Sequence, residues 1–298
     1  IYGSRGANGV ILVTTKKGKQ GKVTLNYSGT VTFETLHDVT EMMSASEWLD
    51  YARIAKYNAG SYASATPTYE ADKAAFGSVA ASWKNIDQAW SNGNYDPSKV
   101  GSYDWASHGK QTGITHEHTL SASGGSDKFQ GYASFGYMDQ KGTQPGQAYE
   151  RYTLKTSFDS NPVEWFKMGT SVNASYSTQD YGYSFSKSVT GSGDFYSALR
   201  SMLPWTMPYD ENNEYIRNPN GDVNIINPIR ELDYNTNQRR TFRASASMYS
   251  QIDFGKIWKP LEGLSYRIQF GPEFQFYTLG IANAADGING DGNNGAQY

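Results

Sequence analysis

His116 and His118 are the residues of this chain whose type and spacing come nearest to a metal site. They flank Glu117, and because side chains alternate along an extended segment, both imidazoles fall on one face of it. A metal ion would need further ligands, and the chain has only 4 histidines in all. Residues 286–295 have the composition of a calcium loop but lack the spacing and the bidentate glutamate of an EF-hand. We therefore predict no metal site.

A glycine-rich opening and several carboxylates also invite a chemical interpretation. The glycines of residues 3–9 precede the run 10–15, which has the β-branched composition of a strand, whereas a phosphate-binding loop follows a strand and opens a helix. The absence of cysteine excludes a thiolate zinc site and a cysteine nucleophile. Four carboxylates share strand faces with basic side chains, as cross-strand charge pairs do: Glu34, Asp159, Asp253 and Glu273. We predict no enzyme, no catalytic residue and no cofactor.

Charge and hydropathy narrow the class of protein further. The 26 basic and 29 acidic residues give a net charge of −3, without the basic excess of a nucleic-acid-binding protein. No run of about 18 apolar residues predicts a membrane-spanning helix. The mean hydropathy is −0.65, yet aromatic residues make up 14% of the chain. A transmembrane β-barrel combines these properties, because its strands are apolar only on alternate residues.

Seven segments alternate between apolar and polar residues with the period of two that predicts a strand. Residues 264–276 do so most clearly, with Leu264 and Tyr266 on one face and Ser265 and Arg267 on the other. The other six segments are 23–34, 117–124, 128–139, 151–159, 166–177 and 242–254. A soluble β-sandwich also alternates, but aromatic residues near the strand ends and an alternation of short and long connections favour the barrel. The predicted fold is all-β, with these strands forming part of a large transmembrane antiparallel β-barrel.

The connections define the two ends of the predicted barrel. Outer-membrane barrels have short periplasmic turns and long extracellular loops. Short turns are predicted at 124–127, 161–164 and 255–263. Long extracellular loops are predicted at about 36–115 and 180–238.

The two long loops hold candidate ligand contacts. They contain Trp48, Trp83, Trp90, Trp105 and Trp205, most of the 7 tryptophans, and aromatic faces are preferred anchors in binding sites. Helical spacing predicts helices at 45–58 and 70–91, and Trp48 lies on the apolar stripe of the first, where a core position is expected. We predict ligand contacts at Trp83, Trp90 and Trp205.

Residues 1–19 read Ile-Tyr-Gly-Ser-Arg-Gly-Ala-Asn-Gly-Val-Ile-Leu-Val-Thr-Thr-Lys-Lys-Gly-Lys. This segment closely resembles the end of the plug domain in the SusC/RagA family of TonB-dependent outer-membrane transporters. The likeness continues in order along most of the chain, through 104–105, 120–125, 137–142, 149–154, 208–210, 227–228 and 263–267. The loops at 36–103 and 180–238 carry little of it, as expected of loops that face a ligand.

The resemblance implies a barrel of about 22 strands, plugged from the periplasmic side. Residues 1–20 would be the C-terminal end of the plug domain, with its last strand, and residues 21–298 the N-terminal part of the barrel. It further implies import of a large nutrient with energy from the TonB complex, in the outer membrane of a Bacteroidota-like Gram-negative bacterium. A SusD-like surface lipoprotein would cap the barrel, and two such pairs would associate.

Two expectations concern the plug and the ends of the chain. Neither Ile1 nor Tyr298 lies at a recognisable domain boundary, so we expect the sequence to be a piece of a longer protein that also holds the TonB box and the remaining strands. Arg5 is expected to form a partly buried ion pair with a carboxylate of the barrel wall such as Glu34 or Glu273. The alternative is that Arg5 contacts only backbone carbonyls.

The predicted function is import of an oligosaccharide, with the outer-membrane lipid, the lipoprotein and the TonB complex as partners and no nucleic acid. A peptide is the alternative ligand, which the composition does not exclude. An extracellular glycan-binding β-sandwich and a passive porin are the alternative proteins.

Overall fold

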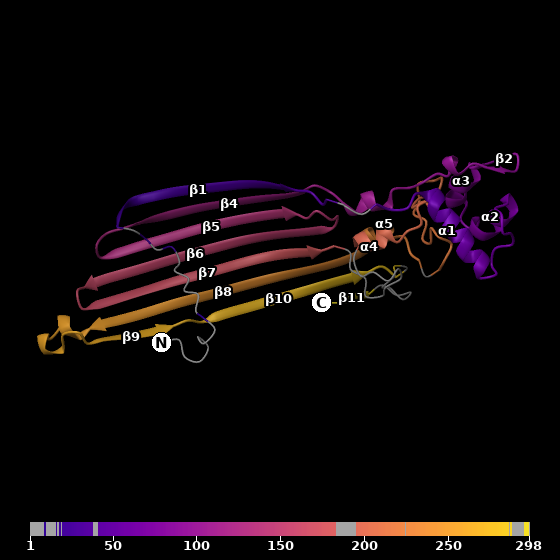
Figure 1. The fold of residues 1–298 in the computed structure, drawn as a ribbon. Helices are drawn as coiled ribbons and strands as arrows, with labels where there is room; N and C mark the ends of the chain where they lie inside the picture. The colour runs from indigo at the N-terminus through magenta and orange to yellow at the C-terminus, as the bar shows by residue number, and fades with distance from the viewer. Residues whose placement is uncertain are drawn as a thin grey trace.

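The computed structural model describes residues 9, 16, 18, 20–37, 41–182, 195–223, 225–285, 287 and 295–297. The strand predicted at 10–15 and Arg5 lie outside the described residues. A long antiparallel sheet is the largest part of the structure, and a group of helices lies beyond one end of its strands (Figure 1).

The sheet has 9 strands in the order β1-β4-β5-β6-β7-β8-β10-β11, with β9 also paired to β8. Every pairing is antiparallel. The strands of this sheet also lie in the order in which they occur along the chain, with β9 and β10 both paired to β8. The strands are β1 (Gly21–Glu34), β4 (Gly113–Gly125), β5 (Phe129–Lys141), β6 (Gln147–Val163), β7 (Phe166–Tyr181), β8 (Asn235–Asp253), β9 (Ser265–Phe270), β10 (Glu273–Asn283) and β11 (Gly295–Gln297).

All seven strands predicted from alternation are present, and the last is divided into β9 and β10. The division falls at Pro272, which has no backbone N–H to donate to the ladder. The register nevertheless continues across the gap, because Phe270 lies opposite Met248 and Glu273 lies opposite Ser245. The side chains therefore keep the same alternation on both sides of Pro272.

The prediction of one helix over 70–91 is wrong. The segment forms α2 (Tyr69–Phe76) and α3 (Ala80–Asp87), followed by the short strand β2 (Trp90–Ser91). Helix α2 ends at Gly77, whose N–H donates to the carbonyl of Lys73 and closes the last turn.

The predicted boundaries of several connections are also wrong. The turn placed at 161–164 consists of Glu164 and Trp165, because β6 extends to Val163 and β7 begins at Phe166. The connection from β5 to β6 covers only residues 142–146, whereas the one from β8 to β9 covers 254–264 and holds two 3₁₀ helices. Short and long connections therefore do not alternate strictly. Strands β5 and β6 extend beyond their apolar alternation and shorten the connection between them, whereas the connection from β8 to β9 remains long.

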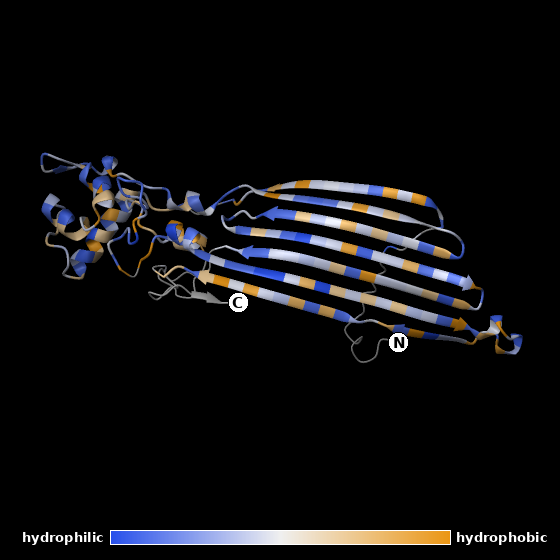
Figure 2. Cartoon of the chain, turned by 180° about the vertical axis from the view of Figure 1, so that it is seen from behind, coloured by the Kyte–Doolittle hydropathy of each residue, from blue (hydrophilic) through white to orange (hydrophobic). Residues whose placement is uncertain are grey.

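Apolar and polar residues alternate along the strands (Figure 2), and the apolar ones share one exposed face of the sheet. Leu25 is 71% exposed and Phe276 is 60% exposed, although both are large hydrophobic residues. Apart from the β2 and β3 (Asn94–Tyr95) hairpin, the described residues form no second sheet, so none packs against this face as a β-sandwich requires. An apolar face of this size on a sheet is suited to contact lipid.

A row of aromatic rings crosses the apolar face near the helical end. The register aligns His118, Tyr137, Tyr152, Tyr176, Phe242 and Phe276 on six successive strands. The next row toward the helices is mostly polar and contains His116, Asp139, Glu150, Thr178, Arg240 and Thr278. An aromatic girdle followed at once by polar residues is the pattern of a membrane interface.

The two long loops fold together into what we call the loop domain, described over residues 41–112, 195–223 and 225–234. It contains α1 (Ala45–Asn58), α2, α3, α4 (Phe195–Arg200) and α5 (Pro228–Tyr234). Helix α1 was predicted with these bounds and begins with a capping box between Ser44 and Glu47. Two buried clusters each draw on both loops: Trp105 with Phe195, Ala198, Leu199, Met202 and Ile229, and Trp205 with Ala45, Leu49 and Ile86.

A buried ion pair joins α1 to α2 inside the loop domain. Arg53 is 4% exposed and donates from Nε to Asp72 Oδ1 at 3.0 Å and from Nη2 to Oδ2 at 2.5 Å. Asp72, which is fully buried, also accepts from Tyr62 Oη at 2.6 Å and from Trp90 Nε1 at 3.0 Å. Burial and the hydrogen bond to Asp72 raise the pKa of Tyr62, so its hydroxyl stays protonated and donating. Four donors thus satisfy one buried carboxylate.

The Asp72→Asn substitution should destabilise the loop domain by about 3–5 kcal/mol, because it removes the buried carboxylate partner of Arg53 and leaves it only Asp50, whose side chain is 55% exposed. Faster hydrogen exchange of the α1 and α2 amides in the whole protein is the measurement. Lys84→Ala serves as the control, since it breaks an exposed ion pair with Glu211 whose side chains are 66% and 70% exposed. Equal exchange in the two variants would contradict the assignment.

Candidate functional site

The face opposite the apolar one carries the charged side chains, and we call it the polar face. The register places on it the predicted cations Arg151, Lys155, Lys167, Arg243 and Arg267. It places the predicted carboxylates there as well, Glu34, Asp159, Asp253 and Glu273. This is the distribution predicted from the alternation of polar and apolar residues.

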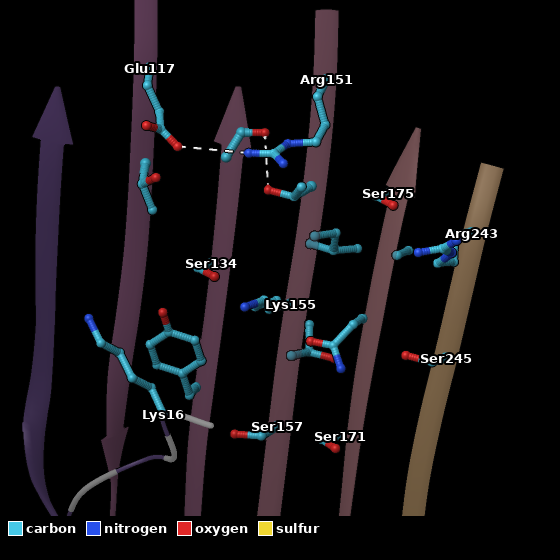
Figure 3. Close-up of a pocket in the computed structure, with 18 residues that line it drawn as sticks. Lys16, Glu117, Ser134, Arg151, Lys155, Ser157, Ser171, Ser175, Arg243 and Ser245 are labelled. Carbon is cyan, nitrogen blue, oxygen red and sulfur yellow. Dashed lines mark hydrogen bonds and ion pairs between the residues drawn. The ribbon is translucent and has the colours of Figure 1, made fainter. Parts of the chain in front are cut away.

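A cavity of about 650 Å³ lies on the polar face over β4 to β8 (Figure 3). Its charged lining consists of Lys16, Arg151, Lys155 and Arg243 with one carboxylate, Glu117. Glu117 and Arg151 approach to 3.8 Å, and Arg243 donates to Gln275 at 2.8 Å. Serine and threonine make up much of the rest of the lining, with Ser134, Ser157, Ser171, Ser175 and Ser245 labelled in Figure 3. The cavity is thus basic and rich in hydroxyls that can both donate and accept.

The N-terminal segment contacts this face directly. Lys16 lies among the residues that line the cavity, and Gly18 is buried against the backbone of Gly131 on β5. A Cβ at Gly18 would lie 2.4 Å from the Gly131 nitrogen, a distance that no side chain accommodates. Glycine is therefore required where the segment crosses the strand.

The predicted ion pair of Arg5 is not tested, because Arg5 lies outside the described residues. Its two proposed partners lie at opposite sides of the sheet, Glu34 on β1 and Glu273 on β10, with β4 to β8 between them. Measured across the sheet, six strand spacings of about 4.8 Å put the two strands about 29 Å apart. One arginine can therefore pair with only one of the two carboxylates.

Near the turn between β6 and β7, polar side chains tie four strands together. Tyr249 on β8 donates its hydroxyl to Asp159 on β6 at 2.7 Å, and its ring lies over Gly169 on β7. The guanidinium of Arg267 on β9 is 4.0 Å from the centre of the same ring. A Cβ at Gly169 would lie 2.4 Å from the ring, so the glycine leaves the space that the tyrosine fills.

The three tryptophans predicted to contact ligand lie in the loop domain, away from the cavity. Trp205 is 2% exposed and packs edge-to-face on Phe76, a position that favours a role in the core. Trp90 is partly buried and its Nε1 is bonded to Asp72. Trp83 is partly buried and packs edge-to-face on Tyr69, with ring centres 5.7 Å apart. Trp83 and Trp90 keep exposed surface that a ligand can reach.

Sequence reasoning missed the polar side chains at the helical end of the polar face. Gln140, Tyr149, Gln179 and Arg239 lie side by side on β5, β6, β7 and β8. Each belongs to a different strand, and strand ends are hard to locate from alternation, so only the pairing register brings them together.

Comparison with known proteins adds independent observations. No protein-family model matches the chain. Within the described ranges, no helix has the length and apolarity needed to span a membrane. TonB-dependent receptor P3 of Formosa agariphila is 29% identical over 273 residues, which are 91% of this chain and 23% of that receptor. TonB-dependent receptor SusC of Bacteroides thetaiotaomicron is 22% identical over 285 residues, 93% of this chain and 24% of that receptor.

Solved structures show the same fold. The RagAB peptide importer in its closed-closed state matches with a TM-score of 0.67 and 25% identity, over 95% of this chain and 31% of the matched chain. Its open-open state matches with a TM-score of 0.68 and 22% identity over the same shares. The sheet corresponds to a portion of the RagA barrel and is not closed here.

The chain spans about a quarter of the length of the curated receptors that it matches. The order of the strands, the two-faced sheet and these similarities agree with one another. The chain is therefore similar in sequence and fold to a portion of the SusC/RagA-type TonB-dependent receptors, which are non-enzymatic transporters of the outer membrane of Bacteroidota-type bacteria.

Proposed function

We propose that the protein to which this chain belongs imports an oligosaccharide across the outer membrane with energy from the TonB complex. The main support for the proposal is that the sheet has one apolar and one polar face. Its apolar face bears an aromatic girdle suited to lipid, and its polar face holds a hydroxyl-rich cavity suited to a hydrated solute.

In this proposal the sheet is the first part of a closed barrel of about 22 strands. The edge of β1 away from β4 has no strand beside it among the described residues. Unpaired backbone groups are not tolerated in lipid, so strands from elsewhere in the protein would complete the barrel. Residues 1–20 would be the end of the plug domain, and the contact of Gly18 with the polar face supports that role.

The proposed partner outside the cell is a SusD-like lipoprotein that caps the loop domain. The RagAB importer supports a two-component assembly, and two such pairs would form the complete unit. The loop domain suits this role because it is a folded body with its own buried clusters, able to present a fixed surface.

The nature of the nutrient is the finer part of the proposal. RagAB is a peptide importer. The hydroxyl-rich lining of the cavity and the partly exposed Trp83 and Trp90 support a sugar for this chain, since aromatic faces stack on sugar rings and hydroxyls pair with hydroxyls.

The topology predicts a difference in chemical labelling of whole cells. A cysteine at Val223, which is 80% exposed in the loop domain, should react with a membrane-impermeant maleimide. A cysteine at Asp127, in the turn between β4 and β5, should react only after the outer membrane is permeabilised. Equal labelling of both positions in intact cells would overturn the orientation.

Growth experiments test the function itself. A strain lacking the gene should fail to grow on an oligosaccharide that supports the parent strain as sole carbon source, and inactivation of TonB should have the same effect. Both strains should grow normally on the monosaccharide, which is the matched control. A growth defect confined to defined peptides would replace the sugar by a peptide, and growth independent of TonB would favour a passive porin.

Trp83→Ala should weaken binding of that oligosaccharide roughly tenfold if the ring stacks on the sugar. The affinity of the purified whole protein, measured by calorimetry, gives the result. Tyr51→Ala is the control, because Tyr51 is another aromatic residue of the loop domain and is 55% exposed. Unchanged affinity in Trp83→Ala would remove this residue from the binding site.

A further inference from the structure

The four side chains missed by sequence reasoning form one line across the sheet, which we call the mouth row. Gln140 lies opposite Tyr149, Tyr149 opposite Gln179, and Gln179 opposite Arg239. Neighbouring strands are about 4.8 Å apart, so the row is about 14 Å long. It lies on the polar face at the end nearest the loop domain, where a nutrient from outside would first reach the sheet (Figure 1).

A small cavity of about 220 Å³ adjoins the row beside Arg239 and is lined by Gln140, Gly142, Gln147, Ala148, Tyr149, Gln179, Asp180 and Tyr181. The carboxylate of Asp180 accepts a hydrogen bond from Gln238. The other polar side chains of the lining are amides and tyrosines, with both donors and acceptors. Such groups recognise a polar ligand by hydrogen bonds, and a free pocket between them leaves room for it.

Two arginines of the polar face have polar side-chain partners, whereas Arg239, like Arg267, lies over a tyrosine ring. Arg151 is 3.8 Å from Glu117, and Arg243 is bonded to Gln275. Among the described residues, Arg239 has no carboxylate partner, and its Nε is buried without a hydrogen bond. Its guanidinium carbon lies 4.5 Å from the centre of the Tyr277 ring, a contact that holds the group in place.

The register shows why no carboxylate reaches Arg239 from the adjacent rows. Toward the cavity, the next residues on β6, β7 and β8 are Arg151, Ser177 and Thr241. Toward the loops, they are Gln147, Tyr181 and Asn237, and the Oδ1 of Asn237 is likewise buried without a hydrogen-bond partner among the described residues. A buried donor without a partner costs free energy that a bound ligand would recover.

The position of the row in the sheet limits how a ligand can bind there. A peptide commonly binds by adding a strand to a free sheet edge. Strands β5 to β8 are each paired on both sides, so their backbone groups offer no such edge here. Recognition must come from side chains, and amides that both donate and accept match sugar hydroxyls.

We propose that the mouth row binds an acidic oligosaccharide, with Arg239 pairing with a uronate carboxylate and Gln140, Tyr149 and Gln179 bonding the hydroxyls of the chain. Arg239 suits a carboxylate because the planar guanidinium donates two parallel hydrogen bonds to it. The inference rests on the proposed import function and specifies the charge of the nutrient.

The test compares acidic sugars with the same sugars lacking the charge. Tetramers of galacturonate, mannuronate and guluronate, each beside its methyl ester, are titrated into the purified whole protein. At least one acid should bind roughly ten- to a hundredfold more tightly than its ester. Arg239→Gln should abolish that preference. Arg240→Gln should retain it, because Arg240 is the next residue, has the same charge and lies on the opposite face.

Each other outcome overturns the proposal. If no acid binds more tightly than its ester, or if Arg239→Gln keeps the preference, the row does not recognise a carboxylate. If Arg239→Gln weakens only tetraalanine with a free carboxyl terminus, the ligand is a peptide. A protein that imports a neutral oligosaccharide equally well with Arg239→Gln would disprove the carboxylate contact while leaving the import function intact.

Discussion

Pairing of backbone groups between neighbouring strands is the constraint on which the rest of the structure depends. A segment that crosses lipid must satisfy every N–H and C=O within the protein, and hairpins of long antiparallel strands do so. Once β1 to β10 pair in sequence, the pleat sends alternate side chains to opposite faces. The aromatic girdle on one face and the charged groups on the other are consequences of this single arrangement, because a one-residue slip would exchange them.

The loop domain follows a different rule. Its residues have no lipid to face, so it is stabilised as a soluble protein is, by two buried clusters and by the Arg53–Asp72 pair. Because each cluster draws on both long loops, neither loop can fold fully without the other. The outer surface is thereby fixed before any ligand or partner arrives, which lowers the entropy lost on binding.

The polar face is divided into three zones by what its charges contact. Near the turns, Asp159, Tyr249 and Arg267 bind one another across four strands. In the middle, the cavity is mostly basic, and the N-terminal segment reaches it through Lys16. At the loop end, the Nε of Arg239 is buried without a hydrogen bond among the described residues. Contacts between strands, contact with the N-terminal segment and the proposed contact with a solute are thus separated along the strands.

The sequence by itself determined the seven strands, the two faces, helix α1 and the absence of a spanning apolar run, because alternation and capping are local properties. Helix boundaries, burial and the alignment of side chains on different strands depend on contacts between distant residues, so the tertiary structure decided them. It divided the segment 70–91 into two helices at Gly77, and it buried Trp205, which had been predicted to contact ligand. It also brought the mouth row together. The physical reason is that register between strands is set by their pairing, and burial by the packing of both loops, neither of which is visible along a single segment.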